Sequence, residues 1–192
     1  MTEINTILMP SRRDMLTGST RLVLSAGAIA LLGNSARAAV AKASVNDVKI
    51  LNVAVGLEYE GINAYAIALK SGLLKQSSVA AATKFREDHL KHNEALIATI
   101  RKLGGEPVVE KTEAEYAKDL HVERLKNHED VLSFAAALEL GATNAYLGVI
   151  PALKDPQLAK IAARLATDEA AHWALLNFDL GRPFMTGLGF GA

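Results

Sequence analysis

The sequence contains no cysteine among its 192 residues. This absence excludes disulfides, iron-sulfur clusters, thiolate zinc sites, c-type haem attachment and cysteine nucleophiles. Any bound metal must therefore be held by histidine, aspartate, glutamate or carbonyl groups. Proline and aromatic residues are also scarce, with 5 prolines and an aromatic share of 5%. Together with abundant alanine and leucine, this composition favours helices.

The charge balance and the missing motifs narrow the function further. The chain has 21 basic and 21 acidic residues, so no net charge draws it to nucleic acid, and we expect no such partner. Half of the residues are hydrophobic, which is enough for the core of about one domain. The sequence has no P-loop, dinucleotide glycine fingerprint or Ser-His-Asp order, so nothing supports an NTPase, a nicotinamide enzyme or a serine hydrolase.

Residues 1–38 have the features of a cleaved export signal. Arg12 and Arg13 precede a mostly apolar run at residues 22–32, which is shorter than the roughly 20 residues that span a bilayer. Small residues at 36–38 match an A-x-A cleavage signal. The segment resembles twin-arginine (Tat) signals, with Met15 where phenylalanine is usual, and this implies export to the bacterial periplasm with no stable membrane anchor after cleavage. The alternative is a chance arginine pair before a retained anchor.

Four segments with apolar residues every three or four positions predict four helices. The first begins at an N-cap at Ser44 and stops at Gly72, and the second follows Ser78 and ends at Gly104. The third pattern reaches Leu153. The fourth helix opens at Asp155, followed by a proline that suits the first helical position.

The two helical hairpins repeat each other. Glu58 and Tyr65 recur 81 residues later as Glu139 and Tyr146, and the pattern of the second helix recurs 80 residues later in the fourth. The charged residues 106–126 join the hairpins, and Thr112 with Glu115 there fits the cap of a short helix. These features predict an all-α four-helix bundle over residues 39–182, with a long crossover between helices 2 and 3.

Ionisable residues interrupt all four apolar stripes. They are three glutamates and three histidines: Glu58, His89, His92, Glu139, Glu169 and His172. Unpaired carboxylates are costly in a core, so a metal, a proton or a partner must neutralise them. Residues three apart share a helix face, and mixed imidazole and carboxylate ligands suit a first-row transition metal. We predict that these six residues bind metal.

This arrangement resembles the ferritin-like superfamily of di-iron carboxylate proteins, which includes the rubrerythrins. The family carries glutamate on helices 1 and 3 and an E-x-x-H pair on helices 2 and 4. Five residues match this pattern, and His89 departs from it because the family has a glutamate there. The resemblance implies one or two iron ions. The departure leaves manganese, zinc or copper open as alternatives, since three carboxylates balance two divalent ions less well than four.

Three functional hypotheses follow. The first is an exported, redox-active iron or manganese protein that oxidises ferrous ions or reduces peroxide, with oxygen or peroxide as partner. The second is a non-catalytic zinc- or copper-binding or stress-protection bundle, which His89 favours. The third is a bundle without metal in which glutamate and histidine neutralise each other. The sequence assigns no catalytic residue.

Three further features have simpler interpretations. Tyr65 and Tyr146 lie on the stripes, where we expect them mainly to fill the core, the alternative being hydrogen bonds around the metal. His121 and His128 are expected in solvent. The glycine-rich apolar tail, residues 183–192, is expected to fold over the end of the bundle or to contact a second copy in a homodimer, and disorder is an equal alternative.

Overall fold

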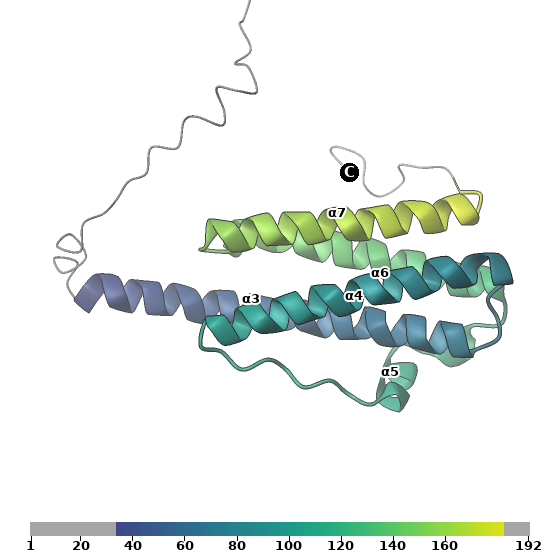
Figure 1. Ribbon diagram of the computed structural model, residues 1–192, viewed down its shortest axis with the longest axis horizontal. Coiled ribbons are helices and arrows are strands. Elements are labelled where there is room, and N and C mark those ends of the chain that lie inside the picture. Colours follow the sequence, from purple (N-terminus) through teal and green to yellow (C-terminus); the bar gives the residue numbers. More distant parts are fainter. Residues whose placement is uncertain (1–33, 183–192) are drawn as a thin grey trace, which may run out of the picture. The chain divides into compact units, whose positions relative to one another are not determined.

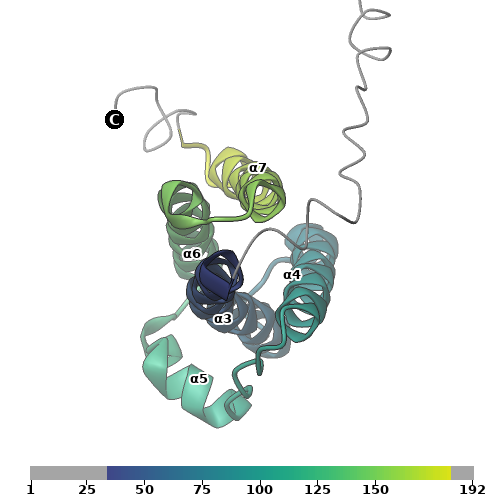
Figure 2. The ribbon, with the colours of Figure 1, turned by 90° about the vertical axis from the view of Figure 1, so that its left-hand side faces the viewer.

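A computed structural model describes the backbone of residues 34–182 and the side-chain surroundings from residue 45. All the regular secondary structure of the described part is helical, as predicted. Four long helices lie side by side: α3 (Asn34–Lys70), α4 (Gln76–Lys102), α6 (His128–Val149) and α7 (Pro156–Asp179) (Figure 1). Figure 2 shows the bundle along its axis, with α5 outside it.

The helices end and begin at residues that the sequence predicted. Gly72, Gly104 and Gly181 have positive φ angles of 71°, 77° and 64°, a backbone conformation that glycine adopts without steric cost. The side chain of Asp155 accepts a hydrogen bond from the backbone N–H of Gln157 and caps α7. The short connections therefore hold α3 against α4 and α6 against α7.

The crossover between the hairpins carries one short helix, α5 (Glu113–Asp119), and a 3-10 turn, η1 (Val122–Arg124). Thr112 accepts a hydrogen bond from the N–H of Glu115, whose side chain accepts one from the N–H of Thr112. This reciprocal cap is the one that the sequence predicted. His121 is exposed at 59% of its side chain, and His128 accepts a hydrogen bond from the N–H of Lys75 at 3.3 Å.

Two helix limits differ from the sequence expectation. The first helix begins at Asn34 instead of Ser44, because the alanine-rich segment before Ser44 has a high helix propensity and extends the helix. The third α-helix ends at Val149 instead of continuing to Leu153. Pro151 has no N–H to donate, and the chain continues as a 3-10 turn, η2 (Ile150–Ala152).

The ends of the chain bear on two further expectations. Most of the predicted export signal and the whole tail, residues 183–192, lie outside the described residues. Within the described part, none of the helices combines the length and apolar character needed to cross a membrane.

The core consists of two apolar clusters with a polar layer between them. One cluster contains large aliphatic residues, among them Leu51, Leu96 and Ile100. The other contains Tyr65, Phe85 and Trp173 together with several alanines. Buried polar residues lie on the same helices as both clusters, so apolar packing on both sides fixes the positions of the polar side chains.

Candidate metal centre

The six predicted residues meet in the bundle core. Each is 9% exposed or less. Every long helix contributes: Glu58 from α3, His89 and His92 from α4, Glu139 from α6, and Glu169 and His172 from α7. The helical repeat thus brings together residues up to 114 positions apart in the sequence. That they bind metal stays a prediction.

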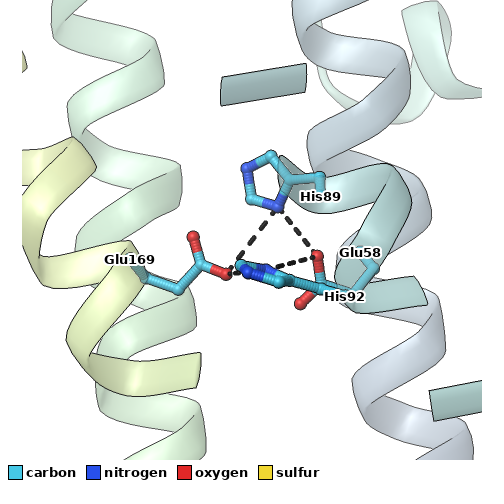
Figure 3. A group of neighbouring side chains, drawn as sticks. All are labelled: Glu58, His89, His92 and Glu169. Atoms are coloured by element: carbon cyan, nitrogen blue, oxygen red, sulfur yellow. Dashed lines mark hydrogen bonds and ion pairs between the residues drawn. The ribbon is translucent and has the colours of Figure 1, made fainter. Parts of the chain in front are cut away.

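The six residues form two overlapping groups whose ligand atoms lie within 4.8 Å of one another. The first group is Glu58, His89, His92 and Glu169 (Figure 3). The second group is His89, Glu139, Glu169 and His172. His89 and Glu169, which occupy equivalent positions of the two hairpins, belong to both groups. Each group therefore takes three residues from one hairpin and one from the other.

The first group is closely packed around the inward nitrogens of two imidazoles. His89 Nδ1 lies 2.8 Å from Glu58 Oε2, and His92 Nδ1 lies 3.1 Å from Glu169 Oε1. A further approach joins His92 Nδ1 and Glu58 Oε2 at 3.6 Å. Figure 3 shows both rings between the two carboxylates.

The second group uses the other nitrogen of His89. His89 Nε2 lies 3.3 Å from Glu139 Oε1, while His172 Nδ1 lies 3.5 Å from the same oxygen. His172 Nδ1 is also 3.2 Å from Glu169 Oε2. His89 thus presents one ring nitrogen to each group. Because a neutral imidazole has one lone pair and one N–H, it can ligate an ion in only one of the groups.

The metal-free cluster neutralises its own charges. Burial alone raises the pKa of Glu139, but hydrogen bonds to His172 and His89 lower it below its usual value. Burial alone lowers the pKa of His92, but Glu169 and Glu58 raise it to about 9. The pKa values of His172, also about 9, and of His89, well above its usual range, rise for the same kind of reason.

Three buried polar atoms of the cluster have no hydrogen bond of normal geometry within the described part of the chain. They are Glu139 Oε2, Glu169 Oε2 and His172 Nδ1, of which the last two face each other as an ion pair at 3.2 Å. Unsatisfied buried polar atoms are rare in folded proteins and indicate a missing partner. All three residues belong to the second group, where a divalent cation would supply a partner, and the mixed nitrogen and oxygen donors suit iron, manganese or zinc. The residues present therefore fit a metal ion.

Two tyrosines fill the core as expected, and their hydroxyls also bind the carboxylates. Tyr65 donates a hydrogen bond to Glu139 Oε1 at 2.5 Å, and Tyr146 donates one to Glu58 Oε1. Each tyrosine is buried, and each serves the glutamate of the opposite hairpin. Burial and the adjacent carboxylate raise the pKa of Tyr65 well above its usual value, so it keeps its proton. Both expected roles, core packing and hydrogen bonds around the candidate site, therefore apply.

Two outer carboxylates, which the sequence pattern did not single out, also contact the cluster. Asp168 Oδ2 lies 3.6 Å from His92 Nε2, and Asp88 Oδ2 lies 3.6 Å from His172 Nε2. These ion pairs hold the outward nitrogens, which keeps Nδ1 of each ring directed at the cluster. The two aspartates are 80 residues apart, so the repeat carried the signal that would have identified them.

Gly61 leaves the space that the ring of His89 fills. A Cβ added to this glycine would lie 2.9 Å from both Cε1 and Nε2 of His89. Such a distance is shorter than ordinary van der Waals contact, so a side chain at this position would displace the ring. A missing methyl group on α3 thus determines where the shared imidazole lies.

Comparisons with known proteins support the fold. A family model described as "Ferritin-like domain" matches residues 46–182, which contain all six cluster residues. No curated protein matches the chain. A solved structure titled as a conserved hypothetical protein, rv2844, from Mycobacterium tuberculosis has a TM-score of 0.60 and 15% identity. That likeness covers 70% of this chain and 97% of the other, and at this identity it shows a shared fold alone.

Proposed function

The chain belongs to the ferritin-like domain family, and we propose that it is an exported protein with a redox-active iron or manganese site in its bundle core. The observation that carries this proposal is the set of three unsatisfied polar atoms within a cluster of three carboxylates and three imidazoles. The proposed reactions are ferrous oxidation and peroxide reduction.

Different residues of the cluster would ligate the two ions. Glu58 and His92 would hold an ion in the first group, while Glu139 and His172 would hold one in the second. Glu169 has an oxygen toward each group and would serve both. The chemistry supplied by bound ions is electron transfer: reducing one hydrogen peroxide to two waters takes two protons and one electron from each of two ferrous ions.

The protons of the cluster must move when ions bind. Imidazoles bind metal through a free lone pair, so a protonated His92 or His172 must first release its proton. The hydroxyls of Tyr65 and Tyr146 hold their protons and fix one oxygen of each acceptor glutamate. Metal uptake is therefore expected to release protons and to weaken as the pH falls.

The location in the periplasm is part of the proposal. Its support is the twin arginine at Arg12 and Arg13, the short apolar run and the A-x-A signal in residues 1–38. Replacing both arginines by lysine should keep the chain in the cytoplasmic fraction with its signal attached. Export of this variant at the normal rate would argue against Tat transport, and a periplasmic form whose mass includes residues 1–38 would argue against cleavage of the signal.

The test of the metal site is elemental analysis of the purified exported protein, followed by anaerobic ferrous titration and addition of oxygen or peroxide. We expect bound iron or manganese and oxidation of added ferrous iron with consumption of the oxidant. Glu169→Gln should lower metal binding in both groups at least tenfold, since Glu169 is shared. The exposed Glu94→Gln on α4 is the matched control. Metal-bound protein without oxidant consumption would refute redox activity.

A zinc or copper protein without redox turnover is the second candidate. The observation that favours it is His89, which makes the donor set richer in nitrogen than four carboxylates would. Purified protein containing zinc or copper in place of iron, and no ferric absorbance after ferrous titration, would support this candidate. If a chelator leaves the stability unchanged and no metal binds, the glutamate and histidine pairs act without metal.

A further inference from the structure

A cavity of about 810 Å³ occupies the part of the bundle where α3 turns into α4. Its lining comes from α3, α4, α6, the end of α7 and the crossover. This volume lies within the range of small-molecule sites, roughly 300–1,000 Å³. We call this space the hairpin-end cavity.

Small side chains leave the space open. Ala64 and Ala68 lie along α3, and Ala82 and Ala135 lie opposite on α4 and α6. The other apolar cluster instead contains Leu96, Ile100 and other large side chains. The lining along α3 runs from Leu57 to Lys70, which spans about 20 Å at the rise of a helix. A volume of this size over that length suits an extended chain.

The inner part of the hairpin-end cavity meets the candidate metal centre. Tyr65, His89 and Glu139 line it, and each is at most 5% exposed. His89 and Glu139 both belong to the second group. A molecule in the cavity would therefore contact the residues around one ion position. This placement favours a substrate over a purely structural filler.

The charged side chains that line the hairpin-end cavity indicate which class of ligand it can bind. Lys70 forms an ion pair with Glu113 at 2.5 Å, so its positive charge is already balanced. Asp179, which accepts a hydrogen bond from Ser78, and Glu60 add acidic groups. An anionic ligand would meet repulsion here, and the remaining lining is mainly apolar. The complementary ligand is an uncharged molecule with a hydrocarbon chain.

We propose that the hairpin-end cavity binds an uncharged hydrocarbon-chain molecule, such as an alkyl alcohol, with one end beside Tyr65, His89 and Glu139. The inference deepens the proposed function, on which it rests for the statement that this end lies next to a metal ion. Binding of the chain itself depends on apolar contact and is independent of metal.

The first experiment is calorimetric titration of the full chain, with and without bound zinc, using 1-decanol as probe. We expect saturable binding of about one molecule per chain, and binding about fourfold weaker for each methylene removed from the probe. Decanoate should bind at least tenfold more weakly than 1-decanol. Absence of saturable 1-decanol binding would overturn the proposal, and so would preference for decanoate.

Variants locate the site. Ala68→Leu should fill the hairpin-end cavity and weaken 1-decanol binding at least tenfold, with metal content unchanged. Ala81→Leu, at an exposed position of the lining, provides a second test if the buried variant fails to fold. The control is Ala163→Leu on the exposed surface of α7. Equal binding by all four proteins would place the probe elsewhere and refute the assignment.

A cobalt(II)-loaded sample separates the two proposals. Paramagnetic broadening of the resonances at one end of bound 1-decanol is expected, and uniform weak broadening would overturn the placement beside the metal. If 1-decanol binds but no ion does, the proposed function fails and the cavity assignment stands. If ions bind but 1-decanol does not, only the cavity assignment fails.

Two other occupants are outcomes of the same test. Phe184→Ser with Phe190→Ser changes the apolar tail of the full chain. A tenfold or greater gain in 1-decanol affinity in this variant would identify the tail as the natural occupant and overturn the proposal. Sedimentation showing that 1-decanol dissociates a dimer would instead identify a second copy. Unchanged affinity and an unchanged sedimentation coefficient support the small-molecule site.

Discussion

Tyr65 on α3 donates a hydrogen bond to Glu139 on α6 across the bundle core, over 2.5 Å. The repeat reproduces this relationship in the opposite direction, from Tyr146 to Glu58. Each hairpin therefore supplies a hydroxyl that orients the glutamate of its partner hairpin. The two halves of the bundle hold each other's carboxylates, which links the stability of the fold to the geometry of the candidate site.

Tyr65→Phe should lower the free energy of unfolding by about 1.5–3 kcal/mol, the range for a hydrogen bond to a charged group. The ring remains, so the change isolates the hydroxyl. Urea unfolding of the metal-free protein measures the effect, and Tyr59→Phe, on a half-buried tyrosine of the same helix, is the control. An unchanged free energy of unfolding in Tyr65→Phe would show that this hydrogen bond adds no net stability.

His89→Glu should raise the iron content toward two ions per chain. A carboxylate offers one oxygen to each group and adds a negative charge, whereas a neutral imidazole offers a single lone pair. The measurement is the molar ratio of iron to protein after anaerobic loading and desalting. His128→Glu, outside the cluster, is the control. The same ratio in His89→Glu as in the unmodified protein would show that His89 does not set the number of ions.

Gly61→Ala should displace the ring of His89, because the new Cβ would lie 2.9 Å from two ring atoms. We expect a loss of about 1–3 kcal/mol in stability and a weaker affinity for metal. Gly56→Ala on the same helix meets no atom within 4 Å, and it should gain about 0.5–1 kcal/mol from the better helix propensity of alanine. Urea unfolding and metal titration of both variants measure these effects, and equal behaviour would argue against a role for Gly61.

The metal-free protein should lose stability as the pH rises from about 6.5 to about 9. His92 and His172 have folded pKa values of about 9 against an ordinary value of 6.5. Between these values the folded state holds protons that the unfolded state has released, so a rise in pH favours unfolding. The full contribution is present below pH 6.5, and its loss is on the order of a few kcal/mol.

Denaturant unfolding in the presence of a chelator, at several pH values, tests this dependence. His92→Gln with His172→Gln should make the curve less steep above pH 6.5, leaving the contribution of His89, whose pKa is also raised. At the acid end, Glu58 and Glu139 have lowered pKa values, so their contribution is lost only as the pH falls below about 4.5. A stability that stays constant from pH 6.5 to 9 would contradict the raised histidine pKa values.

Periodicity and repetition predicted most of the fold. The spacing of apolar residues located the four helices, and the pair Thr112 and Glu115 located the short helix of the crossover. Spacing by three and four also brought all six cluster residues into one core, since side chains at those intervals share a helix face. Helix limits were less certain, because capping at Ser44 competes with the helix propensity of the alanines before it.

The sequence pattern could not predict the hydrogen bonds and ion pairs that the terminal polar atoms of side chains form. The stripe positions of Tyr65 and Tyr146 predict burial, but not the oxygen that each hydroxyl reaches. Asp88 lies about 100° from His89 around its helix, and only the packing of α7 brings it to His172. The hairpin-end cavity was equally hidden, since small residues on one helix leave space only if their neighbours do not fill it.

The division of each four-residue group between the hairpins has a kinetic consequence. Neither hairpin alone contains a complete group, so high-affinity ion uptake can begin only after both have docked. Each hairpin can form early through local contacts, whereas docking must close the long crossover. In a refolding experiment, the rate of metal binding would therefore report the rate at which the two hairpins dock. A bound metal would then slow their separation.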